Sequence, residues 1–283
     1  MKTISSLPEM KAAVRAEKAA GRRIGFVPTM GFLHDGHLSL VRSSKASTGV
    51  TVVSIFVNPA QFGPREDLAK YPRSLERDLE LLKREGVDYV FTPSAEAMYP
   101  AGYRTHVEVE GLQNKLCGRT RPGHFRGVCT VVLKLFHIVS PDTAYFGRKD
   151  AQQAMILRRM AADLDLDIQI EVRPIVREPD GLAMSSRNSY LNARERKAAL
   201  VLSRALDAAR RAVAGGERKA RKLRTLLRKT VAAEARARLD YAEIVDPETL
   251  EPVEEVRDGT LVALAAWVGR ARLIDNWIVD TKG

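Results

Sequence analysis

Residues 50–57 (VTVVSIFV) form an almost unbroken apolar run, and this run constrains the fold more than any other stretch of the sequence. A strand with one wet face alternates apolar and polar residues, so a continuous run predicts a strand buried on both faces of a parallel sheet. Shorter apolar stretches predict further strands at 23–28, 87–91, 143–146 and 167–172.

Helical patterns lie between these strands. The sequence Ser6-Leu7-Pro8-Glu9 is a capping box with proline in the first turn, and it predicts a helix that ends at Gly21. Strands that alternate with helices of about ten to fifteen residues predict a doubly wound, parallel α/β sheet with helices on both faces. The other helices of this domain are expected at 37–46, 74–86, 124–138 and 150–163.

Past residue 187 the sequence predicts a second, smaller domain. Two helices split by Ala214-Gly215-Gly216 precede three strands, which is typical of an α+β arrangement with antiparallel pairing. The boundary is expected near Ile175, so that residues 1–175 form the first domain and residues 176–283 the second, with the loop 177–188 crossing between them. The three strands are expected at 241–245, 261–267 and 271–278.

The formal charge of +11 comes from one stretch of the chain. Residues 194–238 contain fifteen Lys and Arg but only four Asp and Glu, and the charges in the rest of the chain cancel. Apolar residues recur at helical spacing here, which puts the arginines on a solvated helix face. No aromatic residue lies between Tyr190 and Tyr241 to stack a base, so we expect no nucleic acid partner. Attraction of anionic substrates is the functional alternative to a plain solvated surface.

The composition, with 45% hydrophobic and 29% charged residues, is ordinary for a soluble globular protein. No apolar run approaches the roughly 20 residues of a membrane-spanning helix, and the N-terminus lacks the apolar core of a signal peptide. Cys117 and Cys129 have no paired metal-binding spacing and are expected to be buried thiols. We therefore predict a cytoplasmic protein with no membrane partner.

The sequence PTMGFLHDGH at residues 28–37 follows a predicted strand and opens a helix. Ligands of open α/β sheets bind at the carboxyl ends of strands, and the free N–H groups of a helix N-terminus favour phosphate. Gly31 and Gly36 let the backbone approach a ligand closely. His34 and His37, three residues apart, can share one side of the turn and reach one anionic group. Zinc is the competing use of two histidines, but no third ligand is evident.

Two further motifs carry groups that suit a nucleotide. Gly147-Arg148-Lys149-Asp150 follows a predicted strand and opens a helix, with Lys149 as a point charge for phosphate and Asp150 able to cap the helix or hold Mg²⁺. Met184-Ser185-Ser186-Arg187-Asn188 offers hydroxyl donors and a fixed cation for a triphosphate. With the H-x-G-H sequence at 34–37, it resembles the mobile loop of class I aminoacyl-tRNA synthetases, which indicates attack on the α-phosphate of a nucleoside triphosphate.

Five stretches resemble the pantoate–β-alanine ligase family, in the order expected for that family. They lie at 28–37, 56–62 (FVNPAQF), 121–128 (RPGHFRGV), 145–153 (YFGRKDAQQ) and 180–191 (DGLAMSSRNSYL), and they cover nearly the whole first domain. The resemblance implies a Rossmann-like sheet of the H-x-G-H type, within the nucleotidyltransferase and class I aminoacyl-tRNA synthetase-like superfamily.

The resemblance also implies an activity, that of an AMP-forming carbon–nitrogen ligase of pantothenate and coenzyme A biosynthesis. Such an enzyme condenses (R)-pantoate with β-alanine, uses ATP and Mg²⁺, and releases AMP and diphosphate through a pantoyl-adenylate. A homodimer is implied as well. A nucleotidyltransferase of the same superfamily is the nearest alternative, and a nucleic-acid-binding protein that uses the basic helices is the alternative from another class.

Catalytic and nucleotide-binding residues follow from the same resemblance. His37 is the implied proton donor, His34 and Lys149 are further catalytic residues, and Asp150 is the implied Mg²⁺ ligand. Arg148 departs from the family, which often has an acidic residue there. The residues implied at ATP are Met30, Gly31, Phe32, Leu33, His34, Asp35, Gly36, His37, Gly147, Arg148, Lys149, Asp150, Val176, Met184, Ser185, Ser186 and Arg187.

The implied substrate site is built mainly from amide side chains. Gln61 is implied to bind pantoate and to lie near β-alanine, and Gln153 is implied to bind pantoate. A neutral amide both donates and accepts hydrogen bonds, which suits the hydroxyls of a small hydroxy acid. Asn58 and Arg121, in two of the matching stretches, are assigned to the same substrate site. Of the other histidines, His106 and His137 are expected to be structural, and the role of His124 stays open.

Overall fold

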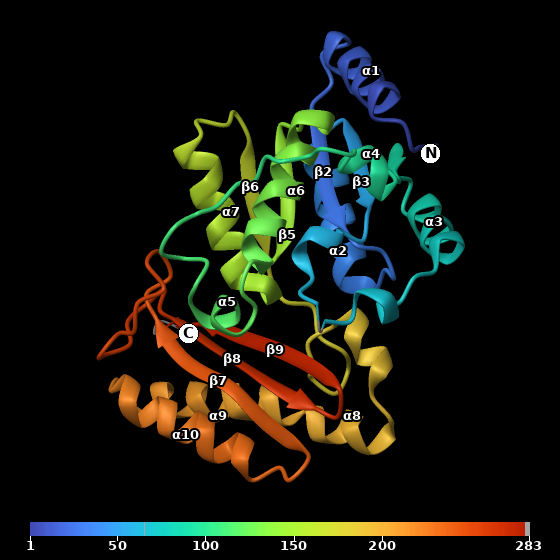
Figure 1. Ribbon diagram of the computed structural model, residues 1–283. Helices are drawn as coiled ribbons and strands as arrows, with labels where there is room; N and C mark the ends of the chain where they lie inside the picture. Colours follow the sequence, from blue (N-terminus) through green and yellow to red (C-terminus); the bar gives the residue numbers. More distant parts are fainter. Residues whose placement is uncertain (65, 281–283) are drawn as a thin grey trace. The chain divides into compact units, whose positions relative to one another are not determined.

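The computed structural model describes residues 1–64 and 66–280, and the chain divides into two compact units (Figure 1). The first unit consists of Met1–Asn114, Gly118–Arg148 and Gln152–Pro174. The second consists of Lys115–Cys117, Lys149–Ala151 and Ile175–Gly283. Two short segments that precede residue 174 are therefore grouped with the second unit, and one of them carries Lys149 and Asp150.

The first unit is built on a six-stranded sheet with the strand order β1-β4-β3-β2-β5-β6. Every pairing described in it is parallel, so the predicted doubly wound sheet is confirmed. The chain order reverses on either side of β2, and ligands of such sheets bind outside the carboxyl ends of strands at this switch point. The strands are β1 (Lys2–Ile4), β2 (Ile24–Thr29), β3 (Val50–Ile55), β4 (Tyr89–Phe91), β5 (Thr143–Gly147) and β6 (Gln169–Arg173).

Helices cover both faces of this sheet, as two neighbouring residues of β2 demonstrate. Successive residues of a strand point to opposite faces. The Phe26 ring meets Phe136 of α6 (His124–Val139) edge-on, with 6.5 Å between ring centroids. Val27 instead packs in a buried cluster with Val41 of α2 (Asp35–Ser47). The other helices before residue 174 are α1 (Leu7–Ala19), α3 (Leu75–Arg84), α4 (Ala95–Met98), α5 (Leu116–Thr120) and α7 (Ala151–Asp163).

The second unit is a three-stranded antiparallel sheet in the order β7-β8-β9, which confirms the predicted α+β arrangement. Alternate residues of β8, such as Val262 and Leu264, join the core cluster on one face, together with helix residues such as Leu206 and Leu223. Each such side chain stabilises the unit by about 1.5–3 kcal/mol relative to leaving it exposed. The elements are α8 (Ala193–Ala199), α9 (Val201–Ala214), α10 (Ala220–Ala232), β7 (Ala237–Val245), β8 (Leu261–Val268) and β9 (Ala271–Ile278).

The basic stretch divides between core and solvent as its periodicity predicts. Leu202 and Leu227 are buried, whereas Arg204, Arg211 and Arg228 are exposed. The prediction that the whole stretch to residue 238 is helical is wrong, because α10 ends at Ala232 and the last arginine lies in β7. The solvated helix face is therefore confirmed for α9 and α10.

Other elements also differ from the sequence prediction, and β7 starts at Ala237 rather than at residue 241. Strand β1 was not expected, because three residues are too short to show a period, yet Ile4 is only 1% exposed and β1 pairs with β4. Helix α2 starts two residues earlier than expected, at Asp35, because His34 is extended and caps it. The first helix of the second unit is two helices, α8 and α9, which meet at Leu200.

Cys117 and Cys129 are free and buried, as predicted. Burial raises the pKa of the Cys129 thiol to about 12, so this thiol stays protonated and acts as a small apolar side chain. Among the described residues, no helix is both long and apolar enough to cross a membrane.

Gly127 provides a test of the packing in the first unit. It lies on α6 against the short 3-10 turn at Pro59–Gln61, and an added Cβ would clash with the Ala60 carbonyl oxygen. We expect Gly127→Ala to lower the free energy of unfolding by about 1–3 kcal/mol in urea titrations. The new Cβ and the Ala60 carbonyl oxygen are both attached directly to the backbone, so neither can move aside by a change of rotamer. Gly49→Ala is the control, since its Cβ would find its nearest atom at 3.6 Å. Equal stability of the two variants would contradict this packing.

Candidate active site

The turn between β2 and α2 is held in a tight, glycine-dependent conformation. Gly31 and Phe32 both have positive φ, at 79° and 50°, and Gly31 adopts this without the steric cost of a side chain. The Gly31 N–H donates to Thr29 Oγ1 at 3.2 Å, and this hydroxyl donates in turn to the Ser54 carbonyl of β3 at 2.8 Å. The turn is therefore fixed to the carboxyl ends of two neighbouring strands.

His34 and His37 lie on the same side of this turn, as their spacing predicts. Their ring centroids are 4.0 Å apart, and the His34 backbone N–H donates to His37 Nδ1 at 3.3 Å. His34 is the capping residue of α2, and His37 is in its first turn. Both imidazoles thus stand beside the positive end of a 13-residue helix, where an anion is favoured.

Asp78 of α3 clamps the same turn, and the sequence analysis missed it. Its carboxylate is 1% exposed and accepts from the N–H groups of Phe32 at 2.7 Å and Leu33 at 2.8 Å. Burial raises the pKa of Asp78, and the two backbone donors oppose this rise only in part. The available signal was its position four residues before buried Leu82, which places a carboxylate on the apolar face of a helix.

Asn58 and Gln61 follow β3 and lie with Met30 in one hydrogen-bonded group. Asn58 Nδ2 donates to Gln61 Oε1 at 3.0 Å, and Gln61 Nε2 donates to Met30 Sδ at 3.2 Å. Tyr99 OH donates to Asn58 Oδ1 at 2.7 Å, which fixes the orientation of this amide. Both amide side chains are at least 90% buried. Gln153, the other predicted pantoate ligand, is half-buried on α7 of the same unit.

The Arg121 side chain is bound by two other side chains, Glu66 and His124. Its guanidinium donates to both carboxylate oxygens of Glu66, at 2.8 and 2.6 Å, and contacts His124 Nε2 at 2.9 Å. His124 Nδ1 in turn lies 2.8 Å from the Gln61 carbonyl, so His124 links Arg121 to the amide group. Burial alone would raise the pKa of Glu66, but the hydrogen bonds and charge of Arg121 outweigh it and lower this pKa. Arg121 thus supports the backbone at Gln61.

Gly147 and Arg148, at the end of β5, belong to the first unit, and the second unit carries the remaining predicted site residues. Lys149 Nζ lies 3.4 Å from the exposed Asp150 carboxylate. In the loop that follows β6, the Met184 N–H donates to the Val176 carbonyl at 3.0 Å, and Ser185 Oγ accepts from the Arg187 N–H at 3.3 Å. Lys149 and Ser185 line one small pocket, together with Leu182, Ala183, Asn188, Leu202, Leu273, Ile274 and Asp275.

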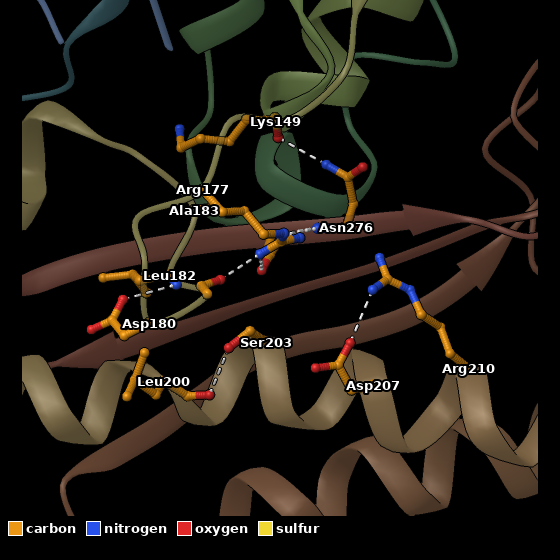
Figure 2. Close-up of polar contacts among 12 residues, drawn as sticks. Lys149, Arg177, Asp180, Leu182, Ala183, Leu200, Ser203, Asp207, Arg210 and Asn276 are labelled. Carbon is orange, nitrogen blue, oxygen red and sulfur yellow. Dashed lines mark hydrogen bonds and ion pairs between the residues drawn. The ribbon is translucent and has the colours of Figure 1, made fainter. Parts of the chain in front are cut away.

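An ion pair holds the loop 177–188 against β9. Arg177 donates to both carboxylate oxygens of Asp275, at 2.7 and 2.9 Å, and to the Gly181 carbonyl at 2.9 Å (Figure 2). Asp275 is 1% exposed, and a carboxylate this deeply buried requires such a partner. Asn188 closes the loop by donating to Glu178 at 2.8 Å and to the Ala183 carbonyl at 3.1 Å.

In residues 1–64 and 66–280, no three His, Cys, Asp or Glu side chains are grouped so that they could hold a metal ion. A Mg²⁺ ion carried by a nucleotide needs fewer protein ligands, because water and phosphate oxygens supply most of its coordination. The carboxylate of Asp150 is exposed and fits that more limited role.

The parallel sheet and the capped turn at its switch point define a Rossmann-like α/β enzyme. A family model described as pantoate–β-alanine ligase matches residues 2–278. The chain belongs to this family, and it is a ligase that joins pantoate to β-alanine in the synthesis of pantothenate. The family match therefore favours the ligase over the nucleotidyltransferase alternative.

Relatives match along the whole chain. Pantothenate synthetases of Pelotomaculum thermopropionicum and Thermotoga neapolitana are both 56% identical to it over 279 residues, which is 99% of this chain and 99% and 100% of theirs. A crystal structure of the pantothenate synthetase of Thermus thermophilus matches with a TM-score of 0.94 and 46% identity, covering 98% of this chain and 99% of that one. The ligase of Francisella tularensis, solved with β,γ-ATP and β-alanine, matches with a TM-score of 0.82 and 33% identity over all of both chains.

The Asp78 clamp can be tested by removing its acceptors. Asp78→Ala leaves two backbone N–H groups without their partner, so we expect the free energy of unfolding to fall by about 2–4 kcal/mol. The turn that carries His34 also loosens, so kcat/KM should fall about 10–100-fold. Asp78→Asn keeps one acceptor and should lie between these values.

The control for the clamp is Glu76→Ala, which removes an exposed carboxylate from the same helix turn. It should change neither quantity. If Asp78→Ala kept the parent kcat/KM while remaining folded, the clamp would have no part in activity.

Proposed function

We propose that the chain makes pantothenate in two steps through a pantoyl-adenylate. A carboxylate oxygen of (R)-pantoate attacks the α-phosphorus of ATP, and the bond to diphosphate breaks. The amine of β-alanine then attacks the carbonyl carbon of the mixed anhydride, loses a proton, and AMP leaves. The observation that carries this proposal is the pair His34 and His37 at the N-terminus of α2, where two imidazoles and the positive end of the helix favour a phosphate.

ATP is the proposed ligand of two sets of residues. In the first unit these are the residues of the turn, Met30 to His37, and Gly147 and Arg148 at the end of β5. In the second unit they are Lys149, Asp150, Val176 and the loop residues Met184 to Arg187. The Francisella tularensis relative supports this assignment, since its structure was solved as a complex with an ATP form and β-alanine.

The first step needs cations, because it brings two negatively charged substrates together. A carboxylate must approach a polyanionic nucleotide, so like charges have to be screened before an oxygen can reach the α-phosphorus. Lys149 and Arg187 supply fixed positive charge for this purpose, and His37 is the proposed proton donor. Mg²⁺, when bound with the nucleotide, would supply further positive charge, with Asp150 as its proposed protein ligand.

Pantoate is proposed to bind at the amide group of the first unit. Gln61 and Asn58 are buried and already oriented by hydrogen bonds, which is what recognition of a small hydroxylated substrate requires. Gln153 is the third proposed pantoate residue, and Gln61 is also proposed to lie near β-alanine. Arg121 is proposed to act on this site indirectly, through His124 and the backbone of Gln61.

Three broader proposals accompany the reaction. Residues 1–175 are proposed to form the ATP- and pantoate-binding domain, and residues 176–283 a smaller lid domain. The enzyme is proposed to act as a homodimer in the cytoplasm.

Isotope exchange tests the order of the two steps. A bare carboxylate is a poor electrophile, so activation has to precede attack by the amine. We therefore expect ATP and pantoate to exchange label with diphosphate in the absence of β-alanine. Exchange that strictly required β-alanine would contradict an adenylate intermediate.

His34 and His37 are expected to act mainly on the transition state. Charge builds on the phosphates as diphosphate leaves, so donors beside them bind the transition state more strongly than ATP. Replacing either histidine with alanine should lower kcat about 10²–10³-fold, with a smaller change in the KM for ATP. His106→Ala is the matched control and should leave kcat nearly unchanged. A His37→Ala enzyme that kept full kcat, or lost activity only by unfolding, would remove this role.

A further inference from the structure

Two neighbouring residues of β9 reach two different parts of the second unit. Asn276 Nδ2 donates to the backbone carbonyl of Lys149 at 2.9 Å. Asp275 accepts both hydrogen bonds of Arg177 and also accepts from the Asn276 N–H at 2.8 Å. Both residues are buried, with 2% of Asp275 and 3% of Asn276 exposed when backbone and side chain are taken together. The contacts with Lys149 and Arg177 are not local in sequence, since these residues lie 127 residues before Asn276 and 98 residues before Asp275.

These contacts converge on one pocket. Lys149 and Ser185 line it from two separate segments, and Asp275 forms part of its wall. Figure 2 shows Asn276 bonded to Lys149, with the helix α9 beneath them. The strand therefore fixes both the residue that carries the proposed phosphate cation and the loop that carries the proposed phosphate donors.

We propose that Asn276 is a positioning residue for Lys149, and that Asp275 plays the same part for the Ser185 loop through Arg177. A lysine side chain has four rotatable carbon links, so its ammonium is placed well only if its backbone is held. The 3.4 Å contact with exposed Asp150 gives little restraint by itself. The hydrogen bond from buried Asn276 supplies the missing restraint. This inference rests on the proposed function of Lys149.

The first test compares two kinetic constants in Asn276→Ala. Loss of the restraint should raise the KM for ATP and lower kcat, so that kcat/KM for ATP falls about 10–100-fold. The KM for pantoate should not change, because the proposed pantoate residues belong to the first unit. A variant that had merely lost part of its folded fraction would change neither KM.

Thr230→Ala is the matched control for Asn276→Ala. It removes one side-chain hydrogen bond of the second unit, from Thr230 Oγ1 to the Leu226 carbonyl within α10. Its KM values should equal those of the parent. If Asn276→Ala is too unstable to assay, Asn276→Ser leaves a smaller cavity and takes its place in every measurement.

A double-mutant cycle decides whether Asn276 acts through Lys149. If it does, Asn276→Ala should cost nothing further in a Lys149→Ala enzyme. Losses that multiply would overturn the positioning role and leave the role of Lys149 intact. A Lys149→Ala enzyme with full kcat/KM for ATP would instead overturn the proposed function of Lys149, and the positioning role with it.

Discussion

Parallel pairing of β2 with β3 and β5 is the constraint on which the rest of this structure depends. Parallel strands that are neighbours in a sheet end on the same edge, whatever their separation in sequence. The turn with His34 leaves β2 at this edge, the turn with Asn58 leaves β3, and the chain leaves β5 at Gly147. Segments from three parts of the sequence therefore start at the same edge of the sheet.

The proposed site residues of the two units differ in chemical type. The first unit contributes imidazoles and neutral amides, and it holds them with buried acceptors such as Asp78 and with the chain of contacts from Glu66 to Gln61. The proposed cations Lys149 and Arg187 belong to the second unit, and Arg148 belongs to the first. In both units the residues that would touch a ligand are held by others that would not, which is how a site keeps its geometry before the ligand arrives.

Local sequence patterns were enough to predict the sheet, the second domain and the positions of the motifs. Periodicity reports burial, and burial of the run at 50–57 on both faces demanded helices on both sides. What the patterns could not give were contacts between distant residues. Asp78 lies in a helix rich in charged residues. Nothing nearby in sequence shows that its carboxylate accepts hydrogen bonds from the backbone of Phe32 and Leu33.

The same limit applies to Asn276 and to β1. In the sequence, Asn276 is one polar residue in a predicted strand, and only the structure shows its hydrogen bond to Lys149. Strand β1 is too short to be recognised except through its pairing with β4. Motif residues such as Gln61 were found because a family pattern marks them. Their supporting residues, Tyr99 and Glu66 among them, carry no local signal, since their roles exist only in the folded chain.

The central claim, that this ligase consumes ATP to activate pantoate, is tested most directly by its products. ATP would be supplied with pantoate and β-alanine, singly and together, and nucleotide and pantothenate would be quantified by chromatography. The account predicts equal amounts of AMP and pantothenate when both substrates are present, and no sustained turnover with either alone. Pantothenate formed with release of ADP, or formed without consumption of ATP, would contradict it.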